Sequence, residues 1–397
     1  MSGMPDIELD LYACLQCGYC KNNCPVYSEL GWESNSPRGK LFMLRQFLEY
    51  TPVDLLTGVR SKLGQKFFES LYRSCTTCGA CQEVCHEEIN LPEIWEELRE
   101  WLVNEGYEPF PGHKAMAAGI KTLRNPFGAP VEKRLEWVVD EKFPKNAEIV
   151  YFVGCNISYN FFKLATATVK LLQKAGVNFT VMGPDEWCCG DPLALTGQMD
   201  EFARLANHNI AEIEGRGATR MVTGCAGCYR TFKHIYPARV GKGAFEVIHI
   251  SELLSELIDA GKLRLTKPAK GKFIYHDPCE LARLGGVFDA PRKVLENVPG
   301  VGKLLEFDGN RRKGVCCGGG GGLKAIQNDT ALRIGGKKAQ AAFDAGADNI
   351  VSCCPSCKFN INQACVEKKK WYKENKPDAR FKMDMNDIVE IVSRSVE

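Results

Sequence analysis

Cys14-Leu-Gln-Cys17-Gly-Tyr-Cys20-Lys-Asn-Asn-Cys24-Pro25 lies near the start of the chain, and its spacing returns in Cys75-Thr-Thr-Cys78-Gly-Ala-Cys81-Gln-Glu-Val-Cys85-His86. Both stretches follow the pattern C-x2-C-x2-C-x3-C. On a regular helix, the first three thiolates would spread over roughly 120° of the surface. A loop wrapped around a compact metal centre can instead bring each thiolate to a different metal atom. We therefore expect two metal-binding loops, in which Gly18 and Gly79 let backbone N–H groups come close to the centre.

This spacing is typical of bacterial proteins with two cubane [4Fe-4S] clusters, in which the fourth cysteine of each run binds the other cluster. The rule predicts one cluster on Cys14, Cys17, Cys20 and Cys85, and a second on Cys75, Cys78, Cys81 and Cys24. Structural zinc sites are the alternative, but they commonly use two CxxC pairs for each ion. His86 follows the second run, at the position where Pro25 follows the first. This is a small departure from the ferredoxin pattern, because the proline is not a ligand.

Composition narrows the class of protein. The chain has 397 residues, enough for two or three domains, and it carries 20 cysteines. Its 51 basic and 49 acidic residues nearly balance, so nucleic acid is not expected as a partner. We find neither a secretory signal nor an apolar run of about 18 residues, and we expect a cytoplasmic protein without a membrane span. In a reducing compartment, this many thiols favours metal ligands over disulfides.

The second half of the chain repeats itself. Cys155, Cys188-Cys189-Gly190 and Cys225-Ala-Gly-Cys228 recur at nearly constant offsets as Cys279, Cys316-Cys317-Gly318 and Cys354-Pro-Ser-Cys357. This repetition indicates duplicated domains. We predict a multidomain protein of the α+β and α/β classes, with an α-helical two-cluster domain over 1–110 and a linker over 111–146. Two duplicated α/β domains are expected over 147–265 and 270–397.

Each repeat begins with an apolar segment that is expected to form a strand ending at its first cysteine, over 149–155 and 273–279. In the first repeat, the pattern predicts helices over 164–175 and 202–213 and a strand over 221–223. Strands that alternate with helices predict parallel sheets with ligand sites at the strand ends. The five glycines from Gly318 to Gly322 fit no nucleotide-binding pattern, and we expect them to let the backbone pass close to an inorganic core.

The N-terminal part resembles the helical ferredoxin module of the succinate dehydrogenase iron-sulfur subunit. The resemblance rests on the two cysteine runs and on helices predicted over 40–50 and 66–72, with Pro37 and Gly39 placed before the first helix. Trp95 and Trp101 follow the second run and are expected to dock a redox partner. The alternative is that they form the buried face of the helix that ends this module.

The repeated C…CCG…CxxC pattern resembles the CCG domains of the heterodisulfide reductase family. That resemblance implies a noncubane [4Fe-4S] cluster as the catalyst in each complete motif. One cluster would be held by Cys155, Cys188, Cys189, Cys225 and Cys228, and the other by Cys279, Cys316, Cys317, Cys354 and Cys357. Cys353 is then either spare or a substitute for Cys354, and Cys365 is expected to be a buried apolar thiol.

The domain order resembles the D-type subunit of the membrane-associated heterodisulfide reductases of methanogenesis. The resemblance implies a disulfide oxidoreductase that reduces the coenzyme M-coenzyme B mixed disulfide, or a related disulfide, to two thiols. Electrons would pass through the two cubane clusters to the two noncubane clusters. The implied partner is a cytochrome b membrane subunit, with a flavoprotein or a hydrogenase as alternatives, so the chain would be attached peripherally to the membrane.

The family's substrate carries sulfonate, phosphate and carboxylate groups, so cations are expected near the clusters. Candidates are Arg230, Lys233, Lys324 and Lys358. His276, together with Asp277, is a candidate for proton transfer to the leaving thiolate. A hydrogen bond at the strand end is the alternative role for this pair, and His234 is a weaker candidate.

Two other functions remain open. One is an electron-transfer subunit of a flavin-dependent glycolate, lactate or glycerol-3-phosphate dehydrogenase. The other is the CCG subunit of a sulfite-reduction membrane complex, and a zinc-binding interaction protein is a more distant possibility. In the dehydrogenase subunits, cysteines of the CxxC pairs are often missing. The sulfite-reduction subunits usually have only one intact CCG motif. Both motifs are complete here, which favours disulfide reduction.

Overall fold

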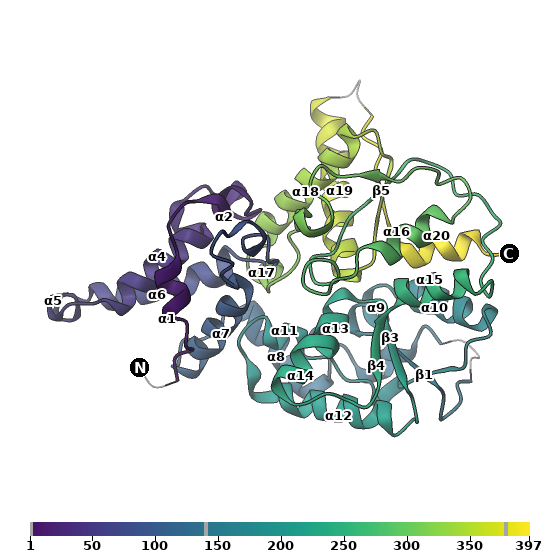
Figure 1. Ribbon diagram of the computed structural model, residues 1–397, viewed down its shortest axis with the longest axis horizontal. Coiled ribbons are helices and arrows are strands. Elements are labelled where there is room, and N and C mark those ends of the chain that lie inside the picture. Colours follow the sequence, from purple (N-terminus) through teal and green to yellow (C-terminus); the bar gives the residue numbers. More distant parts are fainter. Residues whose placement is uncertain (1–2, 139–141, 377–379) are drawn as a thin grey trace.

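Two four-stranded parallel sheets follow a helical N-terminal region, as Figure 1 shows. The computed structural model describes residues 3–138, 142–376 and 380–397. The remaining positions of the predicted domains and of the predicted linker, 1–2, 139–141 and 377–379, lie outside the described residues. The predicted fold class is confirmed. None of the helices in the described ranges is both long enough and apolar enough to span a bilayer.

The N-terminal region packs its helices around one apolar core. The predicted helices over 40–50 and 66–72 are confirmed as parts of α4 (Pro37–Leu48) and α6 (Val59–Arg73). The other elements of this region are α1 (Glu8–Ala13), α2 (Tyr19–Asn22), α3 (Tyr27–Leu30), η1 (Glu33–Asn35), α5 (Pro52–Leu56), η2 (Gln82–Val84) and α7 (Leu91–Asn104).

Pro37 and Gly39 lie inside α4 and not before it. Ser36 caps this helix, since its Oγ accepts a hydrogen bond from the Gly39 N–H at 2.9 Å. Proline is tolerated at the first helical position because the N–H it lacks has no partner there. In α7, Trp95 and Trp101 are 1% and 4% exposed and belong to the core. They therefore cannot form a docking surface.

Residues 111–146, predicted as a linker, contain α8 (Pro111–Leu123) and η3 (Val131–Leu135). α8 contacts α11 and α17, one from each α/β domain, and η3 contacts α9 and η4 of the first. His113 of α8 has its Nε2 at 2.9 Å from the Gly322 carbonyl oxygen. Arg134 of η3 forms a fully buried ion pair with Glu186, at 2.6 Å. This segment is therefore part of the packed structure wherever it is described.

The first α/β domain has the strand order β2-β1-β3-β4, with all neighbours parallel. Its strands are β1 (Ile149–Phe152), β2 (Phe179–Val181), β3 (Arg220–Thr223) and β4 (Glu246–His249). Its helices are α9 (Cys155–Asn160), α10 (Phe162–Lys174), η4 (Gly183–Asp185), α11 (Asp191–Ala194), η5 (Met199–Glu201), α12 (Phe202–Glu214), α13 (Ala226–Arg230), the π-helical η6 (Thr231–Ile235), α14 (Tyr236–Arg239) and α15 (Ile250–Asp259). The helices predicted over 164–175 and 202–213 and the strand over 221–223 are confirmed.

The second α/β domain repeats this topology with the order β6-β5-β7-β8. Its strands are β5 (Phe273–Tyr275), β6 (Leu305–Glu306), β7 (Asn349–Ser352) and β8 (Asp384–Asp387). Its helices are α16 (Asp289–Glu296), η7 (Arg311–Lys313), α17 (Leu323–Ile326), α18 (Asn328–Asp344), α19 (Pro355–Asn375) and α20 (Ile388–Ser395). In both domains, the strand before the first cysteine pairs with the strand before the CxxC motif, so Ile149 faces Arg220 and Phe273 faces Asn349.

The strands predicted up to Cys155 and Cys279 end earlier, at Phe152 and Tyr275. Gly154 has φ +80°, which directs the chain away from the strand and into α9. A side chain at Gly154 would also lie 3.2 Å from the sulfur of Cys228. In the second domain, Pro278 cannot continue the hydrogen-bond ladder because it lacks an N–H. Each first cysteine therefore sits just beyond its strand, at the carboxyl edge of the sheet.

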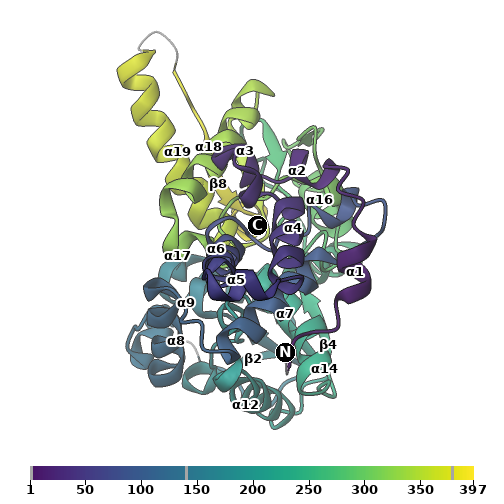
Figure 2. The ribbon, with the colours of Figure 1, turned by 90° about the vertical axis from the view of Figure 1, so that its left-hand side faces the viewer.

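Equivalent helices join the two α/β domains. α10 packs on α20 and α15 packs on α16, so each contact uses one helix from either domain. These four helices lie between the two sheets in Figure 1. The N-terminal region contacts the second domain through α3 and α18 and through α6 and α17, which lie side by side in Figure 2. Glu29 of α3 forms ion pairs there with Arg333 and Lys337, at 3.5 and 2.7 Å.

Arg99 of α7 joins all three domains. Its side chain is fully buried and donates hydrogen bonds to the carbonyls of Leu71 and Cys75 in the N-terminal region. It also donates to the carbonyl of Leu195 in the first α/β domain and to that of Gly321 in the second, the latter at 3.0 Å. One guanidinium thus satisfies four backbone acceptors that meet at the junction.

We expect Arg99→Met to destabilise the domain junction, because it leaves buried carbonyls without donors. A hydrogen bond from a charged group contributes about 1.5–3 kcal/mol, so the loss should be on the order of 3 kcal/mol. Thermal unfolding and limited proteolysis of the full chain would measure it, with the exposed Arg264→Met as the matched control. Equal melting temperatures for the two variants would contradict this role of Arg99.

Candidate iron-sulfur and disulfide site

The N-terminal cysteines line two small cavities, with four cysteines in each. Cys14, Cys17, Cys20 and Cys85 surround the outer cavity, and Cys17 is exposed at the surface. Cys24, Cys75, Cys78 and Cys81 surround the inner cavity. The structure therefore brings together the two crosswise quartets that the spacing predicts, with the last cysteine of each run placed among the first three of the other.

The cysteine loops are irregular, as expected for loops that wrap around a centre. Gly79 has φ +74°, and a side chain there would lie 3.1 Å from both Arg283 and Leu284 of the second α/β domain. Thr77 also has a positive φ, of 49°, and its N–H donates to the Cys75 sulfur at 3.3 Å. This loop therefore presents backbone donors to sulfur on one side and packs closely against another domain on the other.

Burial disfavours the thiolate form of these cysteines unless a positive charge compensates for it. It raises the pKa of Cys20 to about 11 and that of Cys24 to about 11. At neutral pH such thiols stay protonated unless a cation binds them. The buried Lys40 ammonium lines the inner cavity, but its own pKa is lowered by burial. Four soft sulfur donors that need a positive partner fit an iron-sulfur cluster in each cavity.

All five cysteines of the first CCG motif line one larger cavity of about 540 Å³, which also reaches the glycine run of the second domain. Cys155 begins α9, and Cys225 precedes α13 at the end of β3. Cys188 and Cys189 precede Gly190, whose φ of +90° starts α11. The thiols therefore meet where parallel strands end, which is the usual place for a site in such sheets.

The cysteines of the second CCG motif also gather in one group. The thiol of Cys316 interacts with those of Cys279 and Cys317. Cys357 interacts with Cys317 and Cys354. All five cysteines predicted for this motif are thus placed together. Cys365 lies apart from them on α19, where burial raises the pKa of its thiol to about 12, as expected for a buried apolar thiol.

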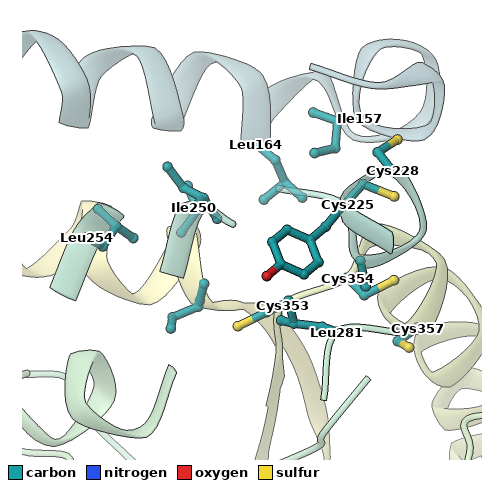
Figure 3. Packing of buried hydrophobic residues seen from close by; sticks show 14 of the residues in the cluster. Ile157, Leu164, Cys225, Cys228, Ile250, Leu254, Leu281, Cys353, Cys354 and Cys357 are labelled. Atoms are coloured by element: carbon teal, nitrogen blue, oxygen red, sulfur yellow. The ribbon is translucent and has the colours of Figure 1, made fainter. Parts of the chain in front are cut away.

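The cysteine groups touch one another from domain to domain. The thiol of Cys78, in the inner quartet, interacts with that of Cys316 in the second CCG motif. The thiol of Cys354, in the same motif, interacts with that of Cys225 in the first. Figure 3 shows the sulfurs of Cys225, Cys228, Cys354 and Cys357 on the same side, whereas the sulfur of Cys353 points away from them. Cys353 is therefore poorly placed to substitute for Cys354.

His276 lies beside the second motif and not on the wall of the large cavity. One of its ring nitrogens and the sulfurs of Cys317 and Cys357 lie within 4.8 Å of one another. Neither ring nitrogen has a hydrogen-bond partner in the structure, and burial lowers the pKa of the imidazole to about 3. Asp277 has the alternative role, that of hydrogen bonding at the strand end. Its carboxylate pairs with Arg292 at 2.8 Å and accepts a hydrogen bond from the Arg311 N–H at 2.8 Å.

Of the four cations expected near the clusters, the structure places only Lys324 on the wall of the large cavity. Arg230 is paired with Glu96 at 2.8 Å and lines a separate groove. Lys358 is paired with Glu390 at 2.6 Å, and Lys233 donates to the Val247 carbonyl at 3.1 Å. His234 lines the same groove as Arg230.

The glycine run serves domain packing as well as the cavity. A side chain at Gly321 would lie 2.5 Å from the backbone of Thr76, and one at Gly322 would lie 2.8 Å from the His113 ring. The run therefore lets the second α/β domain approach the inner cysteine loop closely. On the side that faces the cavity, Gly319 lies near the Cys317 sulfur, and the closeness of the run to an inorganic core stays a prediction.

Several polar residues at these sites escaped the sequence analysis. Asp191 and Glu280 line the large cavity, and each stands within two residues of a motif cysteine, so proximity could have revealed them. Lys338 and Arg134 are far from any motif cysteine in sequence. Burial lowers the pKa of Lys338 to about 8, although the neighbouring Asp277 and motif thiols favour its charge. Arg134 donates to the Cys155 sulfur at 3.4 Å.

Comparisons with known proteins agree with this architecture. The "4Fe-4S dicluster domain" family matches residues 10–89, and the "Cysteine-rich domain" family matches 149–233 and 273–362. A solved structure described as a hypothetical protein from Helicobacter pylori covers 86% of this chain and 66% of its own, with a TM-score of 0.56 and 10% identity, which supports the fold alone.

Two curated relatives are similar over most of their length. The D-type subunit of the dihydromethanophenazine:CoB–CoM heterodisulfide reductase of Methanosarcina barkeri is 37% identical over 98% of this chain and 94% of its own. A subunit of the fumarate reductase (CoM/CoB) of Methanothermobacter marburgensis is 35% identical over 89% of this chain and 68% of its own. The chain belongs to the family of D-type subunits of heterodisulfide reductases, and it is an iron-sulfur subunit of this type of oxidoreductase.

Proposed function

We propose that this chain is the catalytic subunit of a disulfide reductase. The observation that carries the proposal is that two complete five-cysteine groups touch each other through Cys225 and Cys354. The first group lines a cavity of about 540 Å³, and the second is connected through Cys316 to Cys78 of the inner quartet. Reduction of a disulfide consumes two electrons and two protons, and the sulfur–sulfur bond is replaced by two S–H bonds. A site with two neighbouring metal-binding groups suits the delivery of paired electrons.

The cysteines would hold four clusters. The outer quartet and the inner quartet would each hold a cubane [4Fe-4S] cluster. Each five-cysteine group would hold a noncubane [4Fe-4S] cluster. When bound, these clusters would supply the one-electron carriers and the redox centres at which a disulfide is reduced. The cysteines that would hold them follow one another from domain to domain. Cys20 of the outer quartet lies near Cys81 of the inner quartet, Cys78 of the inner quartet meets Cys316, and Cys354 meets Cys225.

His276 is proposed as the proton-transferring group of the second motif. Its ring is neutral at physiological pH because burial disfavours the charged form. One of its two unpartnered nitrogens lies near the sulfurs of Cys317 and Cys357, so it can donate a hydrogen bond to sulfur at this group. The neutral ring would pass a proton on only by accepting one from water at one nitrogen while it donates one from the other, and because His276 does not line the cavity, that proton would reach the substrate by way of the sulfur-rich site.

The proposed substrate is the mixed disulfide of coenzyme M and coenzyme B or a related disulfide. Support comes from the names of the two curated relatives, both of which carry these coenzymes. The alternatives from the sequence are an electron-transfer subunit of a flavin-dependent dehydrogenase and the CCG subunit of a sulfite-reduction membrane complex, and neither predicts turnover of this disulfide.

Electrons would enter at the outer quartet from a partner protein. Large apolar side chains are exposed on the N-terminal region around it: Leu15 is 67% exposed, Tyr19 55% and Trp32 78%. Leu15 also lines the outer cavity. We propose that a redox protein covers this surface, namely a cytochrome b membrane subunit, with a flavoprotein or a hydrogenase as the other candidates. Attachment of the chain to a membrane would then depend on that partner.

Anaerobically prepared protein should contain about 16 iron atoms per chain and should reduce a disulfide with a reduced viologen dye as the electron donor. Cys317→Ser should abolish turnover and leave the electron paramagnetic resonance signals of the two cubane clusters intact, because Cys317 itself belongs to neither quartet. Transfer of electrons to a quinone analogue only in the presence of a 2-hydroxy-acid flavoprotein, without disulfide turnover, would instead support the flavin-dependent alternative.

The crosswise pairing of the quartets can be tested by combining substitutions. Cys85→Ser should damage the same cluster as Cys14→Ser, so the double variant should lose little more iron than either single variant. Cys85→Ser combined with Cys81→Ser should affect both clusters and lose about twice as much. Iron content and cluster signals measure this, with Cys365→Ala as the control that retains all iron. The opposite pattern of additivity would show that each run binds its own cluster.

A further inference from the structure

Arg134 presents a buried, charged donor to one sulfur of the first CCG motif. Its side chain is 2% exposed, and its Nη2 donates a hydrogen bond to the Cys155 sulfur at 3.4 Å. Its Nη1 pairs with the equally buried Glu186 at 2.6 Å. A guanidinium is not deprotonated in proteins, so this donor is always charged. A permanent cation therefore lies next to a sulfur that would be a ligand of the proposed cluster.

Glu186 fixes the arginine and the backbone before Cys155 together. Its carboxylate oxygens accept hydrogen bonds from the N–H groups of Val153 and Gly154, at 2.8 and 2.9 Å. These two residues lead from β1 into α9, which begins at Cys155. Because one carboxylate holds both the guanidinium and this turn, the direction of the donor relative to the Cys155 sulfur is set by buried groups.

The second repeat has no counterpart of this pair. At the equivalent position before the CCG cysteines, Gly314 replaces Glu186. Asp277 lies close to that position, since a side chain at Gly314 would be 3.4 Å from the Asp277 Cβ. The neighbouring cation, Arg292, pairs with Asp277 at 2.8 Å. In the part of the chain that the structure describes, no arginine or lysine donates to the Cys279 sulfur.

Lys338 is near the thiols of the second motif, but it is arranged differently from Arg134. Its Nζ lies 3.9 Å from the centre of the Phe307 ring. None of the described cysteine sulfurs accepts a hydrogen bond from it. Within the described ranges, the first CCG motif alone therefore combines a permanent cation with a hydrogen bond from that cation to a cysteine sulfur.

We infer that Arg134 is a positioning residue that raises the reduction potential of the metal centre at the first CCG motif. The inference rests on the proposed function, which assigns a [4Fe-4S] cluster to this motif. Net charge and hydrogen bonds to the sulfurs set the potential of such a cluster. An added electron makes the cluster more negative, so a neighbouring cation stabilises the reduced form.

This effect acts at the end of the proposed electron path. From the ferredoxin quartets, electrons would reach the second motif through Cys78 and Cys316, and the first motif through Cys354 and Cys225. A raised potential at the first motif favours retention of an electron beside the large cavity.

Potentiometric titration of the full, cluster-loaded chain, followed by electron paramagnetic resonance, tests the inference. Reduced viologen supplies the electrons: one passes to each centre and the dye is oxidised. In a Cys317→Ser background, which removes a ligand from the second motif, Arg134→Gln should lower the equilibrium constant for reduction of the remaining five-cysteine centre about tenfold, or about 59 mV. In a Cys189→Ser background, where the first motif lacks a ligand, Arg134→Gln should leave the potential of the other centre unchanged.

Further variants separate the potential from folding. Arg134→Gln leaves the buried Glu186 carboxylate without its cation, which destabilises the domain. The double variant Arg134→Gln/Glu186→Gln removes both charges, and it should show the same fall in potential with unchanged iron content. Arg134→Lys retains the cation and should restore at least half of the shift.

The matched control is Arg220→Gln, which breaks ion pairs with Glu246 and Glu256 at the end of β3 opposite to Cys225. It should change neither the potentials nor the iron content. Equal potentials of the first centre in the double variant and in the unaltered chain would overturn the inference and leave the proposed function in place. If Cys155→Ser kept the full iron content and all cluster signals, the first motif would hold no cluster, and both would fail.

Discussion

The buried guanidinium of Arg99 joins the three domains by donating hydrogen bonds to backbone carbonyls of each. Leu71 and Cys75 belong to the N-terminal region, Leu195 to the first CCG domain and Gly321 to the second. Among the described residues no carboxylate pairs with this cation, so its positive charge is not neutralised by an acid. Cysteine thiolates bound to iron would supply negative charge beside it, at Cys75. With a cluster bound at Cys75, domain arrangement and cofactor binding would be linked electrostatically at this junction.

Much of the architecture could be predicted because the informative features are local or repeated. Cysteine spacing groups the N-terminal thiols into the quartets that the cavities show, although ligation itself remains a prediction. The duplication of the CCG pattern predicts two sheets of one topology, which the structure confirms. Strand ends were wrong by a few residues, because Gly154 and Pro278 end the ladders before the cysteines.

What could not be predicted depends on contacts between residues far apart in the chain. Lys358 and Arg230 follow CxxC motifs, yet each is paired with a distant acid, so sequence proximity to a cysteine does not place a cation in the cavity. Arg134 reaches Cys155 from a segment that was predicted to be a linker. The role of the glycine run as a contact with Thr76 likewise depends on how the domains pack.

The inner quartet is covered by the second CCG domain, whereas the outer quartet has a cysteine at the surface. Cys78 meets Cys316, and Arg283 donates to the Cys78 carbonyl at 2.6 Å, so the second CCG domain closes over this loop. Cys17 of the outer quartet faces solvent. Biosynthetic machinery that inserts iron and sulfide would therefore have to reach the inner loop before the C-terminal domain docks, that is, while the rest of the chain is still emerging from the ribosome or undocked. The outer loop can be filled, or repaired after oxidative damage, in the finished protein.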